Sequence, residues 1–115
     1  MKMPSGFDVY IEEGLKTLKN LEKWRDVAKR VKDIVVAIDP EARVYVFGSV
    51  VKGKYTAASD IDILVVTSKT SLKYEIATRV YREVDAPVEL HVVSPREFEA
   101  WYKKFVREDE LVEVN

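Results

Sequence analysis

The first third of the chain carries a helical pattern of apolar residues. From Phe7 to about Ile38 they recur at steps of three and four residues, as on one stripe of a helix: Ile11, Leu15, Leu18, Leu21, Trp24, Ala28, Val31 and Val35. One straight helix of this length would be long for a small protein, so we expect one or two helices with a break near Lys19-Asn20. Asp39-Pro40 ends the pattern.

Three later segments have the composition of strands. Arg43–Phe47, Asp60–Val66 and Val88–Val93 are rich in β-branched and apolar residues. Between the last two, helical spacing runs from Ser71 to Glu83 and stops at Asp85-Ala86-Pro87. The order of elements therefore alternates between helix and strand.

The last part of the chain begins with a helix start signal. Ser94-Pro95-Arg96-Glu97 combines a capping serine, a first-turn proline and a glutamate three positions after the serine, which is typical of a capping box. The following helix has an aromatic face, which we expect in the core, with partner contact as the alternative: Trp101, Tyr102 and Phe105. Leu111–Val114 forms either a short edge strand or a frayed end.

Length and element order together predict the fold class. A chain of 115 residues can bury one hydrophobic core, so residues 1–115 are expected to form one domain. The alternation predicts an α+β fold with a small three- to four-stranded mixed sheet and helices mainly on one face. One face of the sheet is then left to carry a site.

Composition narrows the protein class. The absence of cysteine excludes disulfides and thiolate metal sites, and no apolar run approaches the about 20 residues that span a bilayer. We therefore expect a cytoplasmic protein without a membrane partner. With 19 basic and 20 acidic residues, the net charge of -1 argues against direct nucleic-acid binding.

A glycine-serine turn is the first candidate for chemistry. Gly48-Ser49 follows a strand, and Gly53 lies five residues after Gly48. Backbone N–H groups exposed at such a turn, next to a helix start, can bind phosphate. The alternative is an ordinary glycine turn with a serine helix cap.

Three acidic residues are the second candidate. Asp60 and Asp62 are two apart on a strand, so both carboxylates share one face, where like charges need a cation. Glu89 interrupts an apolar strand, and if that strand neighbours the Asp62 strand the three acids form a cluster that can hold Mg²⁺ or Mn²⁺. The alternatives are a solvent-facing acid pair and a polar residue on an open sheet face.

These motifs carry a family resemblance. Gly48-Ser49-Val50-Val51-Lys52-Gly53 followed by Ser59-Asp60-Ile61-Asp62-Ile63-Leu64 resembles the signature of the DNA polymerase beta type nucleotidyltransferase superfamily. The short length is similar to the minimal nucleotidyltransferases, commonly the antitoxin partners of HEPN-domain ribonuclease toxins in prokaryotes. The resemblance covers about Val44 to Val93.

The resemblance implies roles for individual residues. Gly48 and Ser49 would hold the triphosphate, Asp60 and Asp62 would ligate the metals, and Glu89 would match the third carboxylate, which helps to activate the acceptor hydroxyl. Two residues depart from the family pattern: Lys52 stands where many relatives have arginine, and Glu89 where aspartate is usual.

Five further residues are weaker candidates. Lys52 and Lys54 either meet phosphate or are solvated, and Ser59 and Gly53 belong to the expected nucleotide loop, with Ser59 alternatively orienting it. His91 shares the Glu89 face of its strand and either borders the site or is a satisfied sheet histidine.

The resemblance implies a magnesium-dependent transferase. It would move a nucleoside monophosphate, AMP from ATP, to a hydroxyl of a partner, a HEPN protein for which this chain is the antitoxin. A non-catalytic antitoxin that binds its partner, with or without nucleotide, is the alternative. Transfer to a small molecule such as an antibiotic would need a further pocket wall, and a homo-oligomer remains open.

Overall fold

A computed structural model of the chain describes residues 6–105, 107 and 110–115, without the side chains at 7, 102, 103 and 105. The elements, in chain order, are α1 (Gly6–Glu22), α2 (Trp24–Ile38), β1 (Arg43–Phe47), α3 (Ser49–Lys52), β2 (Ile61–Val66), the 3₁₀ turn η1 (Thr70–Leu72), α4 (Lys73–Glu83), β3 (Val88–Val93), α5 (Pro95–Phe105) and β4 (Val112–Glu113). This order confirms the predicted α+β order. Of the two alternatives for residues 111–114, the structure has the short edge strand, β4.

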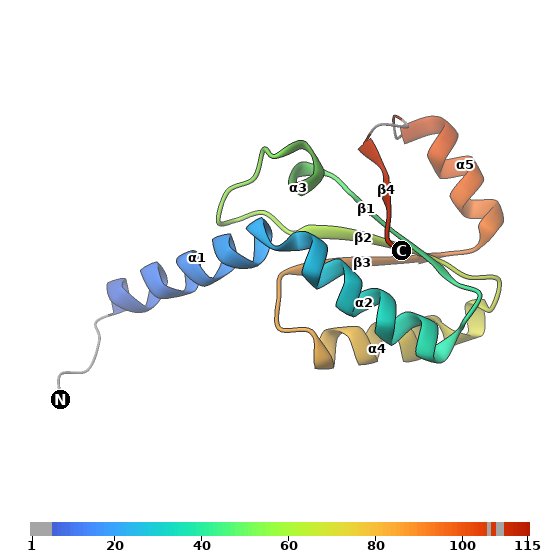
Figure 1. Cartoon of the computed structure of the whole chain (residues 1–115), viewed down its shortest axis with the longest axis horizontal. Helices are drawn as coiled ribbons and strands as arrows, with labels where there is room; N and C mark the ends of the chain where they lie inside the picture. The colour runs from blue at the N-terminus through green and yellow to red at the C-terminus, as the bar shows by residue number, and fades with distance from the viewer. Residues whose placement is uncertain (1–5, 106, 108–109) are drawn as a thin grey trace.

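The strands form one open mixed sheet in the order β3-β2-β1-β4 (Figure 1). β1 is antiparallel to both β2 and β4, whereas β2 and β3 are parallel and joined through α4. In this register Asp62 pairs with Phe47 on one side and with Glu89 on the other. The predicted acid cluster required the Glu89 strand to neighbour the Asp62 strand, and it does. Paired strands lie about 4.8 Å apart, which brings the Asp62 and Glu89 side chains close together.

The main hydrophobic core lies on the sheet face covered by α2 and α4. Alternate residues of β1 and β2 point to this face, and both helices bring their apolar stripes against it. The fully buried members of this core include Leu21, Val31, Val35, Val44, Val46, Ile61, Ile63, Val65, Ile76 and Val80. Two helices and both central strands are thereby fixed to one another.

The opposite face of the sheet is only partly free. Helix α5 packs on it, with the Phe98 ring stacked on Tyr45 at 4.9 Å and the Trp101 ring edge-on to Phe47 at 5.0 Å. The prediction of helices mainly on one face is confirmed, because α2 and α4 cover the main core and α5 lies on the opposite face. The expectation for the side chains of Tyr102 and Phe105 lies outside what the structure describes.

The start of α5 has the predicted capping box. The Glu97 N–H donates to Ser94 Oγ at 3.1 Å, and the Ser94 N–H donates to Glu97 Oε1 at 3.2 Å. These bonds satisfy two backbone donors at the helix start and lower the pKa of Glu97. The reciprocal pair fixes where the chain leaves β3.

The break in the first helical segment falls at Lys23, three residues after the predicted position. Asn20 stays helical, and its side-chain amide donates to the Asp85 carbonyl at 3.4 Å. The later break lets Leu21 and Trp24, on either side of it, both enter the core. Within the described ranges, none of the helices is long and apolar enough to cross a membrane.

Candidate active site

Two acids and a histidine meet where β2 and β3 begin. Asp62 is the second residue of β2, and Glu89, its register partner, is the second residue of β3. His91 follows two residues later on the same face, with Nε2 3.7 Å from Glu89 Oε1. One ligand atom from each of the three residues lies within 4.8 Å of the others.

The local environment opposes a negative charge on Asp62. Its pKa is raised to about 6, chiefly because the side chain is partly buried, then through the hydrogen bond that it shares with Glu89 and the charges of Glu89 and Asp60. Near neutral pH, two carboxylates are thus held side by side in a partly desolvated place. A bound cation would relieve this repulsion.

Asp60 lies outside this close group. It precedes β2, which begins at Ile61 and not at Asp60 as expected, and its side chain is exposed. Its charge still contributes, as the smallest of the four causes, to the raised pKa of Asp62. Of the two aspartates, Asp62 is therefore the one held inside the site.

The glycine turn lies directly against Asp62. Gly48 has a φ of 85°, and a Cβ at this position would lie 2.3 Å from Asp62 Oδ2. Both the left-handed backbone and the contact exclude a side chain here. Ser49 follows this contact and begins α3, and the first N–H groups of a helix have no intrahelical acceptor.

Comparison with known proteins identifies the family. Residues 28–114 match the model of the nucleotidyltransferase domain. The chain belongs to this family. A crystal structure of a candidate nucleotidyltransferase is 28% identical, with a TM-score of 0.61 over 76% of this chain and 96% of that one. Another, from Sulfolobus solfataricus, is also 28% identical, with a TM-score of 0.53 over 90% and 83% of the two chains. No curated protein matches the chain.

The loop of this nucleotidyltransferase domain is closed by its own hydrogen bonds. Gly53 ends α3 with a φ of 69°, a left-handed conformation that favours glycine. Ser59 Oγ accepts the Thr56 N–H at 2.9 Å, and the Ser59 N–H donates to the Thr56 carbonyl at 3.0 Å. Ser59 therefore shapes the turn that leads to Asp60, which was the alternative considered for it.

The two loop lysines differ in their surroundings. Lys52 Nζ lies 3.4 Å from Glu110 Oε1, so its ammonium group faces the segment before β4 in the free protein. The Lys54 side chain is exposed, and its backbone N–H donates to the Ser49 carbonyl at 3.0 Å. The Lys52 side chain thus pairs with Glu110 and the Lys54 side chain is exposed, and neither is seen paired with Asp62 among the described residues.

His91 and Phe47 lie closer to the acid pair of Asp62 and Glu89 than the sequence indicated. The His91 ring lies 5.7 Å from the Phe47 ring, at an angle of 46°. The signal for His91 was its spacing of two from Glu89 on a strand. Phe47 carried no such signal beyond its place before Gly48, because its pairing with Asp62 is a long-range contact.

The group formed by Asp62, Glu89 and His91 fits a divalent cation. Two carboxylates supply the hard oxygen ligands that Mg²⁺ and Mn²⁺ prefer, and an imidazole nitrogen adds a donor better suited to Mn²⁺ than to Mg²⁺. The burial and the neighbouring charges that raise the pKa of Asp62 are the interactions that a bound cation would offset. The arrangement can hold a metal beside a phosphate-binding turn.

Proposed function

We propose that the chain transfers AMP from ATP to a hydroxyl group of a partner protein and releases pyrophosphate. The observation that carries the proposal is the contact of Gly48 with Asp62, which joins the phosphate-binding turn to the acid pair. Membership of the nucleotidyltransferase family supports the reaction class. The nucleotide, the metal and the acceptor are parts of the proposal.

Different residues would bind the triphosphate and the cation. The N–H groups at the start of α3, behind Gly48, would bind the triphosphate. Asp62 and Glu89, with Asp60 at the rim, would hold Mg²⁺ or Mn²⁺, with His91 within reach. When bound, the cation neutralises charge that develops on the triphosphate and lowers the pKa of the acceptor hydroxyl.

Glu89 is the group we assign to the acceptor. The acceptor oxygen would form a bond to the α-phosphorus while the bond from that phosphorus to the bridging oxygen breaks, and pyrophosphate leaves with the electron pair. One oxygen of the Glu89 carboxylate would help to hold the cation, and the hydroxyl proton would pass to the other oxygen, because this side chain is 55% exposed and open to an incoming group. Asp62, more enclosed, would stay with the metal.

An open site suits a macromolecular acceptor. His91 and Glu89 both lie on the solvent side, at 42% and 55% exposure, so a hydroxyl carried on a protein surface could approach them. By family resemblance that partner would be a HEPN-domain toxin, modified on a tyrosine, with this chain as its antitoxin.

A binding-only antitoxin is the second candidate. The observation in its favour is the pairing of Lys52 with Glu110, which keeps the loop cation away from the acid pair. Such a protein would keep the fold and cover its partner without transfer. The two candidates differ in whether label from ATP becomes covalent.

The test is transfer of label from ATP with labelled α-phosphate to the protein encoded next to this chain. We expect wild type to label the partner, and Glu89→Gln to reduce the rate about a hundredfold or more while ATP affinity falls only a few-fold. Glu89→Asp, the matched control, keeps the charge and should retain transfer. Tight complex formation without label supports the binding-only function, and an undiminished rate in Glu89→Gln contradicts the role of Glu89.

A further inference from the structure

Helix α1 carries most of the exposed apolar surface. Six large hydrophobic side chains in the described part of the chain are exposed, and four of them lie on α1: Val9 at 46%, Tyr10 at 81%, Ile11 at 46% and Leu15 at 57%. Figure 1 shows that the N-terminal part of α1 extends beyond the body of the molecule. So much apolar surface on one projecting element indicates a contact surface.

The exposed residues continue a stripe that is buried further along. Leu15 and Leu18 follow Ile11 at steps of four and three residues, and the same stripe reaches Leu21, which is fully buried. Gly14 lies against Ala57, whose Cβ would be 3.9 Å from an added Cβ. The second half of α1 thus packs on the body, while the same pattern in the first half is not covered by any element within residues 6–105, 107 and 110–115.

The distribution of charge along α1 indicates which partner could cover its exposed apolar residues. The first half is acidic, with Asp8, Glu12 and Glu13. The second half carries Lys16, Lys19 and Glu22, and Lys16 Nζ already pairs with Asp85 Oδ2 of the same chain at 2.9 Å. This order also suits the helix dipole. In an antiparallel pair of α1 helices, however, each acidic half would lie beside Lys19 of the other copy, and the two dipoles would oppose each other.

We propose that two copies of this chain pair through α1 in antiparallel orientation, about a two-fold axis near Glu13. Ile11 of one copy packs against Leu15 of the other, and each Asp8 lies beside the second copy's Lys19. Asp8 and Lys19 share one flank because about three helical turns separate them. The inference is independent of the proposed function.

The size of the contact sets its strength. A helix of 17 residues is about 25 Å long, so the pair has a smaller interface than most stable dimers. The proposed dimer is therefore weak, and its population depends on protein concentration. Pairing also removes the exposed apolar stripe from water at the concentrations where it forms.

The first test is sedimentation velocity of the whole chain over a range of concentrations. We expect reversible dimers, about tenfold weaker in Ile11→Ser and unchanged within about twofold in Val9→Ser. These variants are matched, because both side chains are β-branched and 46% exposed, but only Ile11 is on the stripe. Wild type that stays monomeric up to about 1 mM, or equal effects of the two variants, would overturn the proposal.

A charge exchange tests the orientation. Asp8→Lys and Lys19→Glu should each weaken self-association, because each homodimer then contains two like-charge contacts. A mixture of the two variants should associate as tightly as wild type, since both contacts become attractive again. Failure of the mixture to recover would contradict antiparallel pairing, even if wild type dimerises. Circular dichroism of each variant verifies that α1 is still folded.

Discussion

Asp62 is the residue at which stability and chemistry oppose each other. Its carboxylate is partly buried next to Glu89 and directly against the backbone of Gly48. In the free protein this arrangement disfavours the charge, whereas a metal and a triphosphate would need it. The burial and the neighbouring charge that raise the pKa of Asp62 therefore indicate a site that is completed by a ligand.

Replacing this charge should stabilise the free protein. The folded-state pKa of Asp62 is about 6 and the ordinary value is 3.8, so stability falls as pH rises between these values and stays lower above them. Without divalent metal, Asp62→Asn should raise the free energy of unfolding at pH 7.5 by about 1 kcal/mol, allowing for partial exposure and for coupling to Glu89.

Thermal unfolding in EDTA at two pH values measures this effect. The gain in Tm for Asp62→Asn should be several degrees at pH 7.5 and should nearly vanish at pH 4, where the wild-type carboxyl is protonated. Asp33→Asn, an exposed change on α2, should leave Tm unchanged at both. An equal gain at both pH values would show that charge is not the cause.

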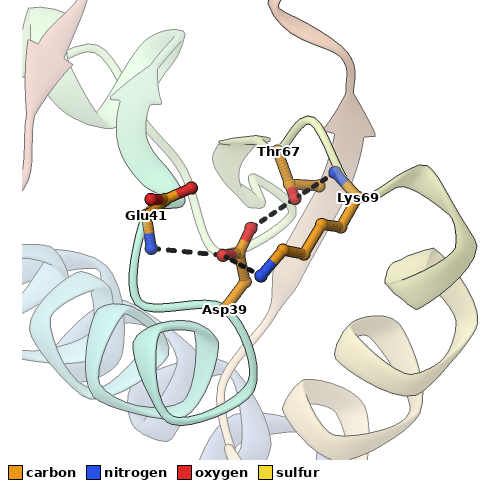
Figure 2. A network of polar contacts seen from close by, with 4 residues as sticks. All are labelled: Asp39, Glu41, Thr67 and Lys69. Atoms are coloured by element: carbon orange, nitrogen blue, oxygen red, sulfur yellow. Dashed lines mark hydrogen bonds and ion pairs between the residues drawn. The ribbon is translucent and has the colours of Figure 1, made fainter.

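At the scale of elements, a buried aspartate joins the end of α2 to the end of β2. Asp39 is 1% exposed; its Oδ2 accepts the Thr67 hydroxyl at 2.5 Å and its Oδ1 accepts the Glu41 N–H at 3.1 Å, with Lys69 Nζ 3.7 Å away (Figure 2). The Thr67 bond is the main cause of the lowered pKa of Asp39. The network holds the central strands to α2, away from the site.

Removing the hydroxyl should destabilise the fold in a pH-dependent way. Because the pKa of Asp39 lies below 3.8, its contribution is present above that value and is lost as the pH falls through the folded pKa. Thr67→Val should cost about 1–3 kcal/mol at pH 7 and less in acid. Urea unfolding at pH 7 and pH 3 measures both, with exposed Thr70→Val as control. A constant cost at the two pH values would contradict the assignment.

The helices and strands could be predicted from the sequence more completely than the way in which they pack against one another. The strands around Tyr45, Ile63 and Leu90 were predicted from their residue composition, and the Ser94 capping box from its residue types, because both are local signals. The mixed sheet was predicted from the order of the elements. The break at Lys23 and the position of α5 depend on long-range packing, so the local pattern missed them. The Asp62–Glu89 pair was predicted only on the condition that their strands are neighbours, and the register fulfils it.

At the scale of the molecule, three distant segments meet at one end of the sheet. The turn after β1 lies beside the starts of β2 and β3 because β1 is antiparallel to β2, which is parallel to β3. At the other end of β1, Arg43 donates two hydrogen bonds to Glu113 of β4, at 3.0 and 3.3 Å. The core on the α2 and α4 face supports this arrangement, so the acid pair need not stabilise the fold.

Calorimetric titration of MgATP into wild type, Asp60→Asn and Asp62→Asn tests the central claim most directly. We predict binding to wild type that EDTA abolishes, a loss of at least about tenfold in affinity for Asp62→Asn, and a smaller loss for the more exposed Asp60→Asn. Asp33→Asn should bind as wild type does. Magnesium-dependent affinity that is unchanged in both site variants would contradict the assignment of the acid pair as the metal and nucleotide site.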